Sequence, residues 1–141
     1  MEKTAEKMYR DIAVGECASF TVTVSDGMVD EFASLSGDHN PIHVDKSYAR
    51  ETPFKGRIAH GMLIGAFFSR LIGMHLPGKY ALYLSQTLAF HQPLAPGTKI
   101  SIEGEVTHKT ETAKVLVIRT AARDAAGKIL VSGEALVRML K

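Results

Sequence analysis

The chain has 141 residues, and 45% of them are hydrophobic, which is enough for one folded domain and too many for a disordered chain. Its 17 basic and 15 acidic residues leave a formal net charge of +2, so neither nucleic acid nor a membrane is expected as the main partner. The single cysteine, Cys17, excludes an intramolecular disulfide. Residues 1–7 carry mixed charges and form no secretory signal, so we expect a cytoplasmic protein.

The first elements are expected to be a strand and a helix. Residues 1–14 are expected to be loosely ordered. Residues 20–24 alternate apolar side chains with threonine, as a half-buried strand does. Ser25 is a suitable N-cap, and apolar residues then recur at helical spacing until Gly37, which can end a helix because it tolerates a positive φ.

The loop after this helix carries the first candidate chemistry. Pro41 cannot continue a helix and biases Asn40 towards extended geometry, so Asp38 and His43 are expected on a stiffened loop rather than on a helical face. A carboxylate and an imidazole held rigidly can share one water molecule, which is the minimum equipment for moving a proton on and off a substrate. Asp and Asn before a proline are also ordinary turn formers, so spacing alone leaves both roles open.

A long helix is expected from Gly61 to about Met74. Apolar residues point in nearly every direction along it, and only Ser69 and Arg70 interrupt them. A helix that is hydrophobic all round must be enclosed, and this one is too short to be enclosed by lipid. The segment Leu76-Pro77-Gly78 is expected to end it.

The rest of the chain is predicted to form strands. Residues 80–90, 99–106, 115–120 and 129–139 have strand composition or a period of two, and residues 124–127 resemble a hairpin loop. One enclosed helix and an antiparallel meander predict an α+β fold with a curved antiparallel sheet wrapped around a long central helix.

The loop motif resembles a known family pattern. With Phe32 and Ser36 before it and Ala49 after it, the string Gly37-Asp38-His39-Asn40-Pro41-Ile42-His43 is similar to the hydratase-2 motif of the MaoC-like family. The His60-Gly61-Met62-Leu63 segment and the order of elements resemble the (R)-specific enoyl-CoA hydratases of that family. The resemblance covers nearly the whole chain, apart from the first dozen residues. It implies a single hot-dog domain over residues 1–141 that pairs as a homodimer.

The resemblance also implies a hydro-lyase reaction. Water would add reversibly and with syn geometry to a trans-2-enoyl-CoA, giving a (3R)-3-hydroxyacyl-CoA. An acyl-CoA thioester is then the substrate, and no cofactor is expected beyond the coenzyme A that belongs to it. Asp38 and His43 are the candidate catalytic pair, acting together on one water molecule, and the residues do not decide which is the acid and which the base. The N–H of Gly61, at the expected start of the long helix, is the candidate oxyanion donor.

Three further side chains are candidates for supporting this site. Asn40 would orient the loop or the substrate, although a plain turn residue fits equally well. His60 is expected to support the site. In the hydratases, a serine at the place of Ser69 supports the catalytic aspartate, whereas many helical serines bond a carbonyl one turn back.

The substrate's acyl chain is expected to lie between the long helix and the sheet. The candidate wall residues are Leu63, Phe67, Ile72 and Val137, and ordinary core packing explains each of them as well. Lys55, Arg57 and Lys79 could meet the phosphates of coenzyme A, although solvated surface charge also accounts for them.

No metal is predicted. Asp38, His39, His43 and His60 carry ligand atoms, but Pro41 opposes the helix that the spacing of His39 and His43 would need.

Three other functions stay open. The same loop would serve a (3R)-hydroxyacyl dehydratase acting on acyl carrier protein. A hot-dog acyl-CoA thioesterase would send water to the carbonyl, and a non-catalytic module would only bind acyl groups. Resemblance also suggests a role in fatty acid metabolism or polyhydroxyalkanoate storage.

Overall fold

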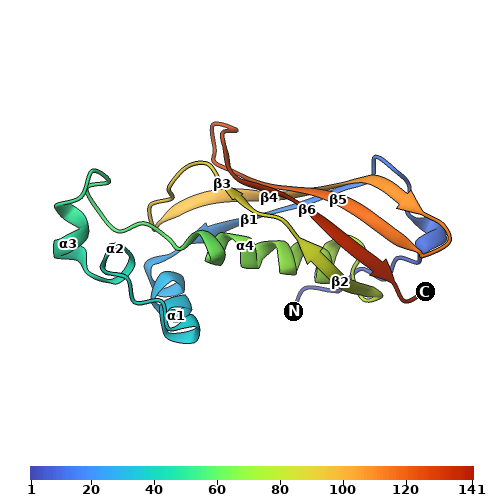
Figure 1. The fold of residues 1–141 in the computed structure, drawn as a ribbon, viewed down its shortest axis with the longest axis horizontal. Coiled ribbons are helices and arrows are strands. Elements are labelled where there is room, and N and C mark those ends of the chain that lie inside the picture. The colour runs from blue at the N-terminus through green and yellow to red at the C-terminus, as the bar shows by residue number, and fades with distance from the viewer.

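The computed structural model describes residues 1–141 and shows a curved antiparallel sheet lying along one long helix (Figure 1). A 3₁₀ turn (Tyr9–Asp11) precedes the sheet, and a π-helical turn (Leu71–His75) extends the long helix. The other elements of the first half are β1 (Cys17–Val24), α1 (Asp26–Ser36), α2 (Pro41–Val44), α3 (Lys46–Arg50) and α4 (Gly61–Arg70).

The second half of the chain supplies the remaining strands, all paired antiparallel with their neighbours. They are β2 (Ala81–Gln86), β3 (Ala89–Phe90), β4 (Thr98–Thr110), β5 (Val115–Arg123) and β6 (Ile129–Met139). The order across the sheet is β1-β4-β5-β6-β2, and β3 also pairs with β6. The predicted α+β arrangement is confirmed. Residues 80–90 form two strands and not one, because the strand pairing with β6 is interrupted at Thr87 and Leu88.

Alternation along β4 shows how the sequence builds this layer. Ile100, Ile102 and Val106 are buried on the face towards α4, whereas Glu103 and Glu105 lie on the other face. Phe68 of α4 is fully buried in the same core. Burying such side chains contributes roughly 1.5–3 kcal/mol each, so the contact between helix and sheet is a main source of stability.

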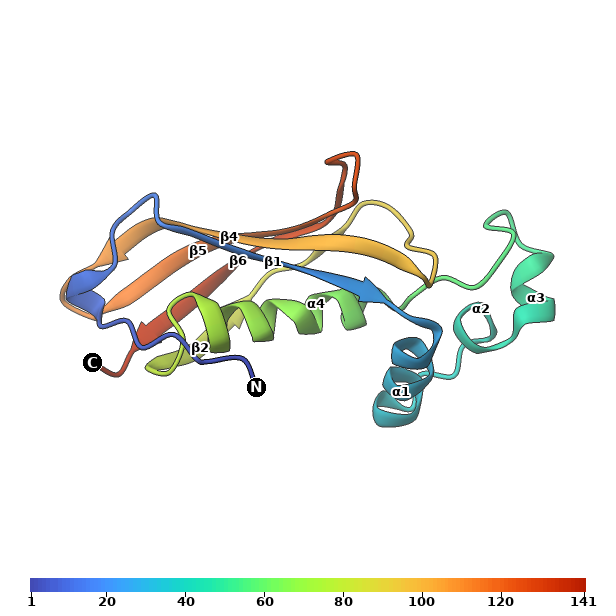
Figure 2. The same cartoon turned by 180° about the vertical axis from the view of Figure 1, so that it is seen from behind.

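The long helix is enclosed on one side only. Figure 2 shows α4 beneath the sheet with its far side uncovered. Met62 is 58% exposed, and Ala66, Ser69, Arg70 and Gly73 are also exposed. These five residues recur at helical spacing, so they form one stripe. The sheet of one chain therefore covers the helix on one side and leaves this side open; we call these five residues the open stripe of α4.

Part of the N-terminal segment, residues 1–14, is packed against the sheet. Tyr9 and Ile12 are only 4% and 2% exposed, in a cluster at the end of the sheet away from α2 and α3. The N–H of Ala5 donates to the carbonyl of Met74 at 2.8 Å. Apolar contacts with sequence-distant strands order this segment, and local pattern does not reveal such contacts. No helix is both long and apolar enough to cross a membrane.

Candidate active site

The candidate loop begins where α1 ends, as the sequence predicts. Ser25 caps α1 by accepting a hydrogen bond from the N–H of Met28 at 3.1 Å. Gly37 ends the helix in the left-handed conformation, with φ 80°. The hydroxyl of Ser36 then accepts a hydrogen bond from the N–H of Asp38 at 3.1 Å. The end of α1 therefore sets the direction in which Asp38 leaves the helix.

The predicted stiffened loop is replaced from Pro41 onwards by a short helix. Pro41 is the first residue of the short helix α2, which carries His43. Proline is tolerated there because the first N–H of a helix has no internal acceptor and the fixed φ of proline suits the position. Asn40 is the N-cap: its side-chain oxygen accepts from the N–H of Ile42 at 3.2 Å, and its own N–H donates to Asp38 Oδ1 at 3.2 Å. Asn40 thus links the aspartate to the helix that carries the histidine.

Asp38 and His43 face each other across a short gap. His43 Nε2 lies 4.0 Å from Asp38 Oδ2, which is too long for a direct hydrogen bond. His43 Nδ1 lies 2.8 Å from the carbonyl oxygen of Ile58. A carbonyl can only accept, so Nδ1 carries the proton and the neutral ring presents a bare Nε2 to the gap. An ionised Asp38 also presents acceptors only, so a molecule that donates two hydrogen bonds could bridge the two groups.

His60 lies behind this pair and is 2% exposed. Its Nε2 donates to the backbone carbonyl of Asp38 at 3.0 Å, and its ring stacks on His43 with centroids 3.9 Å apart. Phe32 closes the other side of the ring with an edge contact at 4.9 Å. His60 therefore contacts both members of the pair, and its supporting role stays a prediction.

Gly61 begins α4 directly after His60. The first helical hydrogen bonds to the His60 carbonyl come from Leu63 and Ile64, so the N–H of Gly61 has no acceptor within the helix. A Cβ added at Gly61 would lie 2.7 Å from the ring of Phe90. A larger residue here would have to displace the Phe90 ring, and the Gly61 N–H lies where the helix dipole favours negative charge.

An open, largely apolar pocket of about 390 Å³ adjoins these groups. His43 and Gly61 lie on its wall, and its other wall residues include Met62, Ile64, Phe90, Leu94 and Val131. Leu63, Phe67, Ile72 and Val137, the predicted acyl wall, are not among the lining residues of this pocket. Ile72 and Val137 are packed in the core cluster around Tyr9 instead. Pocket walls come from distant β3 and β6, and sequence proximity to the motif could not reveal them.

Ser69 is not near Asp38 in this chain. It is exposed on the open stripe of α4, and its hydroxyl makes no hydrogen bond. Eight residues separate it from Gly61, which corresponds to about 12 Å along a helix axis. A role beside Asp38 would therefore need a second copy of the chain.

The three cations considered for the phosphates of coenzyme A, which are Lys55, Arg57 and Lys79, have different surroundings in the structure. Arg57 has a side chain only 6% exposed and donates to Asp30 at 2.8 Å, so it is an internal ion pair. Lys79 donates to Glu6 at 3.3 Å, near the N-terminal segment. Lys55 has no ion-pair or side-chain hydrogen-bond partner.

Ligand atoms of Asp38, His43 and His60 lie within 4.8 Å of one another, which raises the question of a metal. The two imidazole planes are stacked at 24°. Because ring-nitrogen lone pairs lie in the ring plane, those of stacked rings run side by side instead of converging on one ion. His39 lies outside this cluster. The absence of a metal stays a prediction.

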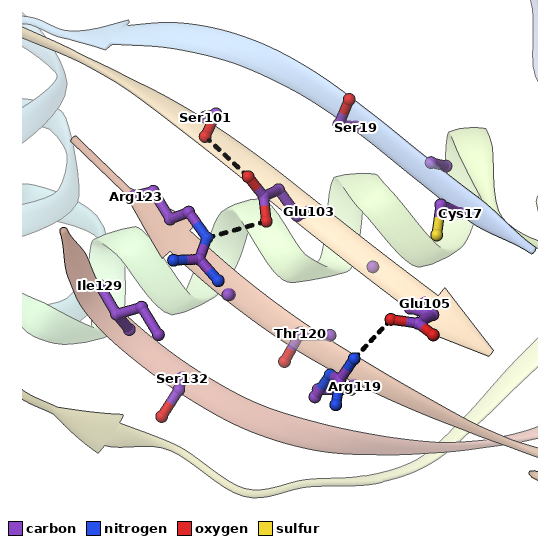
Figure 3. A pocket seen from close by; sticks show the side chains of 13 residues that line it. Cys17, Ser19, Ser101, Glu103, Glu105, Arg119, Thr120, Arg123, Ile129 and Ser132 are labelled. Carbon is purple, nitrogen blue, oxygen red and sulfur yellow. Dashed lines mark hydrogen bonds and ion pairs between the residues drawn. The ribbon is translucent and has the colours of Figure 1, made fainter. Parts of the chain in front are cut away.

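The largest hollow lies elsewhere, on the outer face of the sheet, and has a volume of about 770 Å³. Figure 3 shows its charged side chains on the near face, with α4 behind the sheet. Arg123 pairs with Glu103 at 3.0 Å, and Arg119 pairs with Glu105. These charges neutralise each other and no histidine is present, so this surface offers no acid–base site.

A sheet curved along one helix is the hot-dog fold, and its candidate site holds Asp38 and His43 beside an apolar pocket. The chain belongs to the MaoC-like family, because the family model described as "MaoC like domain" matches residues 13–126. This membership confirms the resemblance seen in the loop motif.

Individual relatives are similar over most of their length. The (R)-specific enoyl-CoA hydratase of Rhodospirillum rubrum is 41% identical over 129 residues, covering 92% of this chain and 89% of its own. The enzyme of the same name from Aeromonas caviae is 37% identical, covering 92% and 97%. Among solved structures, the unliganded R-hydratase PhaJ1 from Pseudomonas aeruginosa is 40% identical with a TM-score of 0.90, covering 94% of this chain and 84% of that one.

Proposed function

We propose that this protein is an (R)-specific enoyl-CoA hydratase, a hydro-lyase that adds water to trans-2-enoyl-CoA and gives (3R)-3-hydroxyacyl-CoA. The observation that carries the proposal is the 4.0 Å gap between Asp38 Oδ2 and Nε2 of His43, a residue that lines an apolar pocket. Two relatives that match nearly the whole chain carry the same enzyme name.

The geometry of the pair suits one water molecule. A water oxygen about 2.8 Å from each acceptor bridges such a gap while donating one hydrogen to His43 and one to Asp38. Both hydrogen bonds increase the electron density on the water oxygen, which prepares it as a nucleophile. The hydrogen bond from Nδ1 to Ile58 holds the ring in the tautomer that this role requires.

The reaction then proceeds in balanced steps. The water oxygen forms a bond to C3 of the enoyl group and releases one proton to the Asp38–His43 pair. The C2–C3 double-bond electrons move onto the thioester as an enolate, and C2 takes one proton from the pair. Because one pair acts on one face of the substrate, oxygen and hydrogen add with syn geometry. Elimination of water is the same path in reverse.

The enolate needs a hydrogen-bond donor, and Gly61 is placed to provide one. Its N–H has no acceptor in α4 and lies at the positive end of the helix dipole. The absent side chain lets a thioester oxygen approach the backbone.

We also propose that the protein is a homodimer. The open stripe of α4 and the end strand β2 are both uncovered, and Leu82 and Leu84 of β2 are 45% and 50% exposed. A second copy would cover the apolar part of this surface and pair the free strand edge. The same packing would bring Ser69 of one copy against the other.

A dehydratase acting on acyl carrier protein is the nearest alternative. A mitochondrial 3-hydroxyacyl-[acyl-carrier-protein] dehydratase of Arabidopsis thaliana is 38% identical over 89 residues, which covers 63% of this chain. Comparing rates with crotonyl-CoA and crotonyl-acyl carrier protein separates the two functions. Release of free thiol from a saturated acyl-CoA would instead indicate a thioesterase.

The names of the relatives support a proposal for the context of the reaction. We propose a cytoplasmic enzyme of fatty acid metabolism. The Aeromonas caviae hydratase of known structure is involved in PHA biosynthesis, and supply of polyhydroxyalkanoate monomers is the corresponding role here.

The direct test follows the loss of the conjugated enoyl absorbance of crotonyl-CoA and then identifies the enantiomer of the product. We expect hydration with the (3R) product. A product of (3S) configuration, or no loss of absorbance, would contradict the proposal.

The Asp38→Asn variant tests the site. It keeps the acceptor for the Asn40 N–H but removes the negative charge, so we expect kcat to fall by about 10³-fold, within the range of general acid–base catalysis. Circular dichroism and thermal unfolding should match the parent. Asp11→Asn, on the distant and exposed 3₁₀ turn, is the control and should leave kcat unchanged. An Asp38→Asn variant with the parental rate would overturn the assignment of the pair.

A further inference from the structure

A second hollow, of about 310 Å³, lies at the end of the molecule where α1 and α3 are found (Figure 1). Cations dominate its wall: Lys46 and Arg50 come from α3, Lys55 and Arg57 from the following loop, and Asp26 is the only carboxylate among its lining residues. The remaining lining residues are Gly56, Ala95 and Pro96.

Only one of these cations is neutralised within the chain. Arg57 is buried between Asp26 and Asp30, with its Nη atoms 3.8 Å and 2.8 Å from their carboxylates. Lys46, Arg50 and Lys55 take part in no ion pair and no side-chain hydrogen bond. Like charges in one hollow repel one another, so this arrangement favours a ligand with several negative charges.

The position of Lys55 adds a second reason. Its φ of 59° lies in the left-handed region, which is unusual for a residue with a side chain. The turn holds this conformation through a hydrogen bond from the Lys55 N–H to the carbonyl of Thr52. Lys46 and Arg50, four residues apart, share one face of α3 and line the same hollow.

The hollow adjoins the candidate active site through shared chain segments. Phe54 lines the pocket of His43, and its neighbour Lys55 lines the basic hollow. Likewise, Leu94 lines the pocket of His43, and its neighbour Ala95 lines the basic hollow. Since consecutive Cα atoms are about 3.8 Å apart, the two openings are neighbours on the surface. A ligand with an acyl thioester at Gly61 and an anionic end beyond the pocket mouth would reach both.

We propose that Lys46, Arg50 and Lys55 bind the phosphates of the nucleotide part of a coenzyme A thioester. The inference rests on the proposed hydratase function and adds a residue assignment to it. Coenzyme A carries a diphosphate and a 3′-phosphate at the end opposite its thioester. Arginine binds phosphate with paired donors and lysine binds it as a point charge, which matches the composition of the hollow.

The experiment compares two substrates with the same acyl group, crotonyl-CoA and crotonyl-pantetheine, which lacks the nucleotide. We expect Lys55→Glu to lower the ratio of their kcat/KM values at least tenfold, through the KM for crotonyl-CoA. Arg50→Ala should act in the same direction. Lys99→Glu makes the same charge change on an exposed lysine of β4 and should leave the ratio unchanged. Equal ratios in the Lys55 and Lys99 variants would overturn the assignment.

Binding of adenosine 3′,5′-bisphosphate by calorimetry gives an independent readout. We expect it to compete with crotonyl-CoA and to bind at least tenfold more weakly to Lys55→Glu. Equal binding would contradict the inference.

The outcomes also separate this inference from the proposed function. If the parent hydrates neither thioester, both proposals fail. If it hydrates both with equal kcat/KM, the hydratase function stands and the phosphate site fails. If Lys55→Glu impairs only crotonyl-acyl carrier protein, the hollow serves a carrier protein and the inference is wrong.

Discussion

The orientation of His43 depends on a single backbone carbonyl. Its Nδ1 donates to Ile58, which leaves Nε2 as the only ring atom that can take a proton from a water in the gap. Lys55 and Arg57 belong to the same short loop as Ile58. The loop thus connects the chemistry of the imidazole with the basic hollow.

Gly61→Ala is expected to lower activity more than stability. The new Cβ would lie 2.7 Å from Phe90, but this ring is 53% exposed and can turn away, so we expect a loss of no more than about 1 kcal/mol. The methyl group would keep a thioester oxygen from the free N–H, and kcat/KM should fall by about 10²-fold, the usual effect of losing one oxyanion donor.

Gly65→Ala provides the matched control for this prediction. It adds the same methyl group one turn along α4, 3.1 Å from Leu88 and away from the helix start. We expect its kcat/KM to stay within threefold of the parent. Steady-state kinetics and thermal unfolding of both variants test this prediction. Equal losses of kcat/KM in the two variants would show that the effect of Gly61→Ala is due to packing alone.

Part of this site could be predicted from residues alone. Asp38 and His43 are five positions apart in a short segment, so their proximity follows from local geometry. The exposure of Ser69 and the burial of Ile72 and Val137 depend on which surfaces meet in the folded chain, and local pattern does not contain that information.

At the scale of elements, α2 is the element whose prediction is wrong. Pro41 is expected to exclude a helix, whereas it begins one. The helix has only four residues and makes few apolar contacts of its own, so its cap contributes strongly to its presence. Asn40 is that cap.

Asn40 variants test whether capping is its function. Asn40→Ala removes the acceptor for the Ile42 N–H and should cost about 1 kcal/mol of stability and several-fold in kcat, because His43 lies on α2. Asn40→Ser supplies another good N-cap and should recover most of both. Chemical denaturation and kinetics measure the two effects. If serine restores stability but not kcat, the amide group itself contacts the substrate and the capping explanation fails.

The long strands and their turns are predictable because each repeats a pattern over many residues. The alternation along β4 and the hairpin loop before β6 are examples. The register shift between Tyr83 and Ser85 is not predictable, because it arises from pairing with β6.

At the scale of the whole molecule, the open stripe of α4 is the main surface that the chain itself leaves uncovered. The sequence pattern predicts an enclosed helix, and one chain encloses only half of it. We therefore expect sedimentation analysis to give twice the chain mass of 15.3 kDa.

Ala66→Arg tests this assembly. A long cation in the middle of the open stripe should produce a folded monomer with at least tenfold lower kcat/KM, because Ser69 would lose its neighbour in the partner copy. Val14→Arg, on a surface loop 59% exposed and outside the stripe, should remain a dimer. A parent protein that sediments as an active monomer would show that one chain suffices.

The proton-handling groups all come from one short stretch, between Asp38 and Gly61, whereas the apolar lining at Phe90, Leu94 and Val131 comes from a different part of the chain. Substitutions in the lining of the apolar pocket can therefore alter which acyl chains bind without disturbing the activation of water. In such an arrangement, a few substitutions are enough to change the specificity towards shorter or longer acyl chains.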